Sequence, residues 1–312
     1  MEKTDNFRPV CYEDREKYYE LFKGIEKNDN GYSNEFAGMT KEEFSTKGIQ
    51  LLLDWSQGKN LYPNFVPTTF YFLYDDENNV VAAFKLRHYL NDYWRKGAGY
   101  ISYCVKKDSR KKGYAKYGLH LAIKTLDKIL PEEDKLIKVS CSRRNFGSFL
   151  SINGNLPLQT EEKDIDYKGK IIEVYSCFID RQNRIVLKTI NEKDINNLND
   201  EYLKNNIKND KIKIFGGYLN NTTLLGYISL EKNNEIYEIK QIKIIENKNN
   251  LIYGLFNYAY ANARVNRIKN ILIDEITFGT LEKEFSFKEK YEYKVLENKK
   301  IEVNVKELFK QE

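Results

Sequence analysis

The chain has 312 residues, of which 41% are hydrophobic and 31% are charged, and its mean hydropathy is −0.66. This composition can form a folded core and excludes a membrane protein, because no apolar run approaches the roughly 20 residues that a span needs. The net charge of +5 is modest, and only one stretch is strongly basic, which disfavours a nucleic-acid-binding surface. We expect a cytoplasmic protein, since the first residues lack a secretion signal. The length fits two domains of about 150 residues.

The first ninety residues are predicted to alternate between strands and helices. Thr40 and Glu43 form a capping-box pattern, in which each side chain satisfies an exposed N–H group of the first helical turn. Residues 60–67 contain two prolines and form a loop, and the polar run 75–79 joins two strands into a hairpin. The expected elements are strand Phe7–Cys11, helices Glu13–Ile25 and Thr40–Ser56, and strands Thr68–Tyr74 and Val80–Arg87.

The central stretch of the chain reads as a strand, a basic turn and a helix. Residues 100–105 are β-branched and aromatic, which favours a strand. Residues 116–130 form the predicted helix, because apolar side chains recur there in steps of three and four. The expected apolar face consists of Ala115, Leu119, Ala122, Ile123, Leu126 and Ile129.

The turn between this strand and this helix is predicted to bind an anion. The first N–H groups of a helix lack partners and lie at the positive end of the helix dipole. Gly113 lacks a side chain and Ala115 has only a methyl group, so a polyphosphate can approach the backbone closely. Long-range attraction comes from a cluster of cations, namely Lys106, Lys107, Arg110, Lys111 and Lys112.

Residues 7–180 resemble the GNAT superfamily of N-acetyltransferases that use acyl-coenzyme A. The resemblance lies in the runs Thr68–Phe72, Arg87–Asn91 and Arg110–Ala115, the last of which has the pattern Arg-x-x-Gly-x-Ala. It implies a mixed α+β fold of the GNAT type and acetyl-coenzyme A as cosubstrate. The residues that it implies for coenzyme binding are Cys104, Val105, Arg110, Lys111, Lys112, Gly113, Tyr114, Ala115, Asn145 and Ser148.

The resemblance also implies how the transfer is assisted, with one departure. The strand Tyr103–Val105 holds the pantetheine arm, and the Val105 backbone helps to polarise the thioester carbonyl. Many members carry a tyrosine as general acid seven residues after the asparagine that corresponds to Asn145, but this chain has Ile152 there. Proton donation then falls to Tyr103 or to solvent, or is not needed, because a thiol of pKa about 8.5 already leaves well near neutral pH.

The acceptor site is predicted to involve the polar and aromatic connection at residues 89–99, since loops on a rigid sheet often carry substrate contacts. The candidates are His88, Asn91, Asp92 and Trp94, and Asp92 is also a candidate catalytic residue. Packing of these aromatic residues onto the core is the alternative.

The four cysteines, Cys11, Cys104, Cys141 and Cys177, are too far apart in sequence for a local disulfide or metal motif. We predict no metal site, and we predict that three of them are core thiols. Cys104 is not expected to act as a covalent nucleophile, because a buried thiol is usually inert.

The first half is completed by strand Leu136–Cys141, a short helix after Asn145, and strands Gln159–Glu162 and Lys170–Ile179. The expected domains are residues 1–181, which bind coenzyme and catalyse, and residues 182–312. The second half repeats the element order with strands near 185–189, 211–218, 223–230, 235–245, 268–274, 291–296 and 301–305 and helices at 192–206 and 250–263. It resembles a degenerate GNAT copy, because the run Glu246–Asn250 lacks the glycine, and we predict no coenzyme site there.

The preferred hypothesis is therefore an N-acetyltransferase that transfers the acetyl group of acetyl-coenzyme A to a primary amine of a small molecule or peptide by direct attack. A noncatalytic module that binds coenzyme A or a nucleic acid as a sensor is the alternative. The second half is expected to be structural, to form one wall of the acceptor cleft, or to mediate a homodimer.

Overall fold

The computed structural model describes residues 6–155, 157, 159–167, 170–181, 184–190, 192–195, 200–246, 248, 251–285 and 291–305. The chain divides into two compact units, the first made of residues 1–152 and 159–182 and the second of residues 153–158 and 183–312. Each unit contains helices packed on β-sheet, so the expected mixed α and β fold is confirmed. Within the described residues, no helix is long and apolar enough to cross a membrane.

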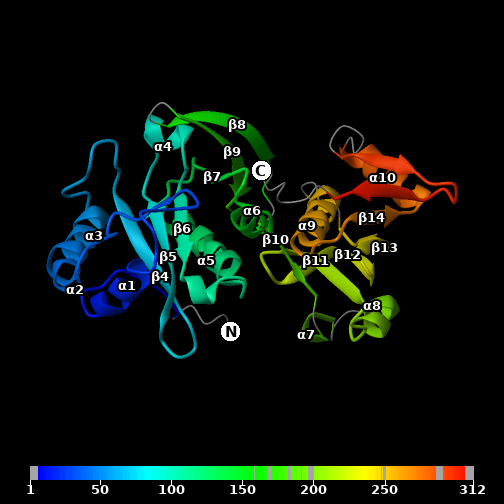
Figure 1. The fold of residues 1–312 in the computed structure, drawn as a ribbon, viewed down its shortest axis with the longest axis horizontal. Coiled ribbons are helices and arrows are strands. Elements are labelled where there is room, and N and C mark those ends of the chain that lie inside the picture. The colour runs from blue at the N-terminus through cyan, green and yellow to red at the C-terminus, as the bar shows by residue number, and fades with distance from the viewer. Residues whose placement is uncertain are drawn as a thin grey trace. The chain divides into compact units, whose positions relative to one another are not determined.

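The described part of the first unit contains two main sheets and a two-stranded hairpin (Figure 1). The larger sheet has the strand order β1-β4-β5-β6 and is antiparallel throughout. The smaller sheet has the order β7-β9-β8. The strands are β1 Phe7–Pro9, β4 Thr68–Tyr74, β5 Val80–Arg87, β6 Ile101–Val105, β7 Leu136–Ser142, β8 Gln159–Tyr167 and β9 Lys170–Asp180. Five of these lie within one residue of the predicted bounds at both ends, namely β4, β5, β6, β7 and β9.

Helices cover both faces of the larger sheet, because β5 carries apolar side chains on each face. Phe84 and Leu86 face the core beneath α5, whereas Ala83 faces the core beneath α1 and α3 (Figure 1). Helix α5 lies close to the sheet, since a Cβ on Gly118 would come within 2.2 Å of Phe84 Cζ. The helices are α1 Arg15–Phe22, α2 Lys41–Glu43, α3 Ile49–Ser56, α4 Asp92–Lys96, α5 Tyr114–Ile129 and α6 Phe146–Asn153.

Three local features of the first unit differ from the sequence expectation. The predicted helix Thr40–Ser56 is divided by a π-helical segment, Phe44–Gly48, although its capping box between Thr40 and Glu43 is confirmed. The connection at 89–99 contains the short helix α4, whose N-cap is Asn91. A small hairpin, β2 Asn28–Asp29 with β3 Tyr32–Ser33, follows α1 and was not predicted. Its turn, Asn30-Gly31, has positive φ at both residues, which a tight hairpin requires.

The second unit is built on one seven-stranded sheet of order β10-β11-β12-β13-β14-β16-β15. Its core gathers apolar side chains of this sheet and of α9. The strands are β10 Ile185–Thr189, β11 Ile212–Leu219, β12 Thr223–Asn233, β13 Ile236–Ile244, β14 Asn270–Ile273, β15 Tyr293–Val295 and β16 Ile301–Asn304. The helices are α7 Glu192–Ile195, α8 Glu201–Asn206, α9 Leu251–Val265 and α10 Glu275–Phe285. The predicted helix 192–206 is thus described as two pieces, and residues 196–199 lie outside the described part.

The cysteines are free thiols. Cys104, Cys141 and Cys177 are buried, as predicted for core thiols, and Cys11 is half-buried. Burial raises the pKa of Cys104 and of Cys177 to about 12, so both are protonated at neutral pH and are poor nucleophiles.

Candidate functional site

Strands β6 and β7 separate from each other in the first unit. The chain just before β6 contacts β7, where Gly99 pairs with Val139 and the Tyr100 N–H donates to Lys138 O at 2.8 Å. Among the described residues, no strand pairs with the β7 side of Ile101–Val105, because β6 is hydrogen-bonded only to β5. One edge of β6 is therefore open.

The register of β5 and β6 decides which backbone groups lie on that open edge. The Lys106 N–H donates to Val81 O at 2.9 Å, which makes Val105 and Ala82 a pair without hydrogen bonds between them. Tyr103 is two residues away and has the same orientation. The N–H groups of Tyr103 and Val105 thus point away from β5, toward the open edge, where they can donate to a ligand.

Cys104, which the resemblance implied as a coenzyme contact, has the opposite orientation. It pairs with Ala83 of β5, and its thiol is buried in the core beneath α1 and α3. Neither its backbone nor its side chain lies on the open edge, because consecutive strand residues alternate in both respects.

The loop after β6 leads directly to the N-terminus of α5. Gly113 is the N-cap residue, and its φ of 88° is a left-handed value that glycine adopts without strain. A Cβ at this position would meet no atom within 4 Å, and no side chain caps the first turn of the helix. The first N–H groups of α5 thus face open space beside the exposed Lys111 and Lys112. This geometry fits an anion, as the sequence predicted.

Arg110 stabilises the loop through protein contacts. Its Nε donates to Val105 O at 3.1 Å, and its guanidinium forms an ion pair with Asp29 of the β2–β3 hairpin. The side chain of Arg110 is therefore already engaged, and the exposed cations beside the anion site include Lys111 and Lys112.

Asn145 and Ser148 are also engaged with protein groups. Asn145 Oδ1 accepts from the Ser148 N–H at 3.1 Å and caps α6, while Asn145 Nδ2 donates to Asn30 O at 3.1 Å. The Ser148 hydroxyl lies 2.7 Å from the Tyr103 hydroxyl. The β2–β3 hairpin thus contacts both the loop after β6 and the start of α6.

Tyr103 has a protonated phenol at neutral pH, because burial raises its pKa well above the usual value. Its ring stacks on Phe84 with centroids 5.5 Å apart, and its hydroxyl bonds to Ser148 as described. Ile152, at the position of the family tyrosine, is fully buried in the core beneath α5. Tyr114 and Ala115 pack against the same core, so they anchor the start of α5.

The four candidate acceptor residues have different surroundings, and one of them lines the pocket described below. Asp92 has a side chain that is 89% exposed and pairs with Arg95 at 3.1 Å. His88 Nε2 lies 2.9 Å from the Thr69 hydroxyl, and burial lowers the pKa of its imidazole. Asn91 caps α4. Trp94 is the one whose ring borders the pocket.

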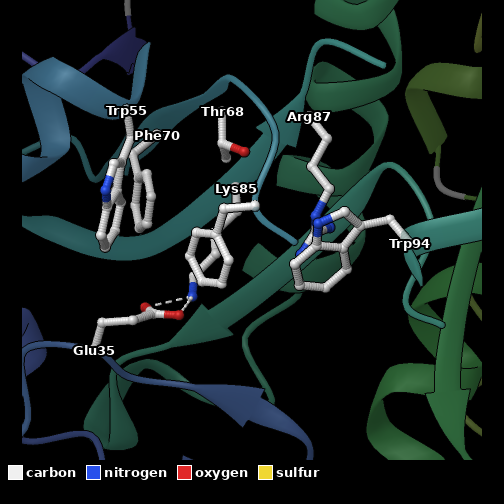
Figure 2. Close-up of a pocket in the computed structure, with 8 residues that line it drawn as sticks. Glu35, Trp55, Thr68, Phe70, Lys85, Arg87 and Trp94 are labelled. Atoms are coloured by element: carbon white, nitrogen blue, oxygen red, sulfur yellow. Dashed lines mark hydrogen bonds and ion pairs between the residues drawn. The ribbon is translucent and has the colours of Figure 1, made fainter. Parts of the chain in front are cut away.

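This pocket, which we call the cationic pocket, lies on the face of the larger sheet that α3 covers (Figure 2). The pocket is small and opens to solvent. Aromatic rings form its walls, and three charged side chains lie among them. The lining residues are Glu35, Trp55, Phe65, Thr68, Phe70, Lys85, Arg87 and Trp94.

Two buried cations distinguish the cationic pocket. Lys85 Nζ donates to both carboxylate oxygens of Glu35, at 2.6 and 2.7 Å, and to Ser33 O at 2.6 Å (Figure 2). Arg87 is 4% exposed, and burial lowers its pKa to about 10, so it is charged at neutral pH. Neither cation was singled out from the sequence, although charged residues at alternate positions of an otherwise apolar strand were a visible signal.

No protein-family model matches the chain, and no curated protein matches it in sequence. Similar solved structures include a spermidine N-acetyltransferase chimera from Vibrio cholerae and hSSAT, with 14% identity over 56% of this chain and 94% of that one and a TM-score of 0.38. A GNAT-family acetyltransferase from Streptococcus pneumoniae has 14% identity over 55% and 96%, with a TM-score of 0.37. A ribosomal-protein-S5-alanine acetyltransferase from Vibrio fischeri has 15% identity over 56% and 92%, with a TM-score of 0.39. Each of these is an acetyltransferase structure to which part of this chain is similar.

Proposed function

We propose that the first unit is an N-acetyltransferase that transfers the acetyl group of acetyl-coenzyme A to a primary amine. The observation that carries this proposal is the open edge of β6, which leads directly into a helix start with a bare glycine. A backbone edge followed by an anion site suits an elongated ligand that ends in a polyphosphate.

The residues present fit the coenzyme. The open space at Gly113 admits a phosphate next to the N-terminus of α5, and Lys111 and Lys112 supply positive charge there. The N–H groups of Tyr103 and Val105 would hold the pantetheine arm and polarise the thioester carbonyl. When bound, acetyl-coenzyme A supplies an activated acyl group that an amine can attack without a covalent enzyme intermediate.

The proposed reaction needs few side-chain groups. The amine nitrogen forms a bond to the acyl carbon, the carbon–sulfur bond breaks, and the amine loses its proton to solvent. Tyr103 is the proposed proton donor to the thiolate, because its phenol is protonated at neutral pH and lies on β6 beside the open edge. The buried Cys104 has no part in this route.

The proposal is tested by incubating the protein with acetyl-coenzyme A and a panel of primary amines, and by measuring free thiol release. We expect amine-dependent release, which Asp92→Asn leaves within about twofold of wild type because its carboxylate is exposed outside the pocket. Binding of acetyl-coenzyme A without release for any amine would contradict catalysis and would indicate a noncatalytic coenzyme-binding module.

A further inference from the structure

The cationic pocket has an excess of positive charge that the described protein groups do not neutralise. Lys85 and Glu35 form an ion pair, and Glu35 also attracts Arg87, but no acidic side chain in the described part of the chain lies within ion-pair distance of Arg87. One carboxylate thus serves two cations. The Arg87 guanidinium donates to neutral groups, Gly99 O at 2.8 Å and the Ser102 hydroxyl at 3.1 Å. A buried cation is costly unless a negative charge accompanies it.

The groups around Arg87 suit a small planar anion. The guanidinium carbon lies 3.6 Å from the centroid of the Trp94 ring, which fixes the plane of the fork. The Trp94 Nε1 atom is buried and has no hydrogen-bond partner among the described residues, so a second donor is available in the same region. A guanidinium fork binds a carboxylate through two parallel hydrogen bonds. One unbalanced positive charge matches a singly charged carboxylate better than a doubly charged phosphate.

The cationic pocket adjoins the strand on which the proposed acetyl transfer takes place. Arg87 bonds to Ser102 of β6, and Ser102 precedes Tyr103. Along a strand, Ser102 and Val105 are separated by about 10 Å, at roughly 3.3 Å per residue. An acceptor that joined the two places would carry its amine and its carboxylate at opposite ends of a spacer of several atoms.

We propose that the cationic pocket selects the acceptor by binding a carboxylate on Arg87, so that the substrate is an amine that also carries an acid group. This inference rests on the proposed acetyltransferase function. It differs from what the name of the spermidine N-acetyltransferase would suggest, because a polyamine would bring further positive charge to a pocket that already has an excess.

Kinetics with two acceptors of equal length test the selection. 5-Aminopentanoate and 1,5-diaminopentane each have five carbons and an amine at one end. The other end is a carboxylate in 5-aminopentanoate and a second amine in 1,5-diaminopentane. We expect kcat/KM for 5-aminopentanoate to exceed that for the diamine at least tenfold. Arg87→Gln should lower the value for the acid at least tenfold and leave that for the diamine within about threefold. Arg95→Gln, an exposed arginine on α4, is the matched control and should change neither.

Binding without coenzyme separates this inference from the proposed function. Both tryptophans of the chain, Trp55 and Trp94, line the pocket, so intrinsic fluorescence reports its occupancy. Pentanoate should change the fluorescence saturably, pentylamine should not, and Arg87→Gln should abolish the response. Arg87→Lys, which keeps the charge but loses the fork, should weaken pentanoate binding and serves if Arg87→Gln does not fold.

The outcomes are distinct. Pentanoate binding that depends on Arg87, with no acetyl transfer to any amine, would support the carboxylate site and contradict the proposed enzyme. Acetyl transfer that prefers the diamine or shows no preference, or an acid preference that survives in folded Arg87→Gln, would overturn the carboxylate site and leave the enzyme standing.

Discussion

The two units of the chain both contain a strand, a loop and a long helix in succession, but the two loops differ. In the first unit the loop from β6 to α5 is basic and ends at Gly113, whose missing side chain leaves open space at the helix start. In the second unit the chain after β13 turns back onto β12, where the N–H groups of Ile245 and Glu246 both donate to Leu225 O. There Glu246 pairs with Lys248 at 2.8 Å, and residues 247, 249 and 250 lie outside the described part.

The strands before the two loops are more alike than the loops are. β13 pairs with β14 only over Ile236–Glu238, so the rest of β13 has no ladder on that side among the described residues. β6 is likewise open beyond Gly99. An open strand edge is therefore common to the described parts of both units, and a bare, basic helix start is described in the first. We propose that this difference confines coenzyme binding to the first unit.

The largest expected effect concerns α6, which begins near the Ser148–Tyr103 contact of the first unit. Ile152 is fully buried there, so Ile152→Ala should lower the free energy of unfolding by about 2–5 kcal/mol, the usual cost of a large truncation in a core. Thermal and denaturant unfolding measure this cost. Turnover per folded molecule should fall by no more than a few-fold. Unchanged stability with abolished thiol release would show that this position serves chemistry.

A smaller effect is expected from removing a negative charge beside the loop of the first unit. Asp29 pairs with Arg110 and places a negative charge beside the anion site. Asp29→Asn should therefore raise the affinity for acetyl-coenzyme A a few-fold at low salt, and the gain should shrink as salt screens the charges. Glu246→Gln at the second loop is the matched control and should leave the affinity unchanged. A loss of affinity in Asp29→Asn would mean that the ion pair is needed to shape the loop.

Much of the fold could be predicted because the apolar patterns of this chain agree with its secondary structure. Strands β4 and β5 follow from two runs joined by a polar turn, and the apolar face of α5 follows from its periodicity. The β2–β3 hairpin was missed because its strands have two residues each, too short for any pattern. The cationic pocket was missed because its charges come from segments far apart, Glu35 before α2 and Arg87 at the end of β5, and only the folded chain brings them together.

The loop residues illustrate the limit of a motif. The glycine pattern correctly located a bare helix start at Gly113, since that property depends on local backbone geometry alone. The motif could not indicate that Arg110 pairs with Asp29 or that Asn145 bonds to Asn30, because both partners lie in the hairpin that local sequence did not reveal.

The smallest expected effect is a pH dependence of stability at His88. Burial lowers the pKa of this imidazole, so the unfolded chain binds its proton more readily than the folded chain does. The folded chain therefore loses stability at His88 as the pH falls through the imidazole pKa of the unfolded chain, about 6.5, and toward the lower pKa of the folded chain. His88→Gln should remove that part of the slope in unfolding measured between about pH 7 and pH 5. An identical slope in both proteins would contradict the assignment.

The most direct test of the account is a calorimetric titration of acetyl-coenzyme A into the wild-type chain and into Gly113→Asp. The new carboxylate would occupy the open space and oppose the phosphate, so affinity should fall by one or two orders of magnitude, about 1.4 kcal/mol for each factor of ten. Gly38→Asp is the matched control, because Gly38 has a φ of 87° and equally open surroundings away from the loop. We expect one site per wild-type chain, lost in Gly113→Asp and kept in Gly38→Asp, with circular dichroism unchanged in both. Two sites per chain, or full affinity in a folded Gly113→Asp protein, would contradict it.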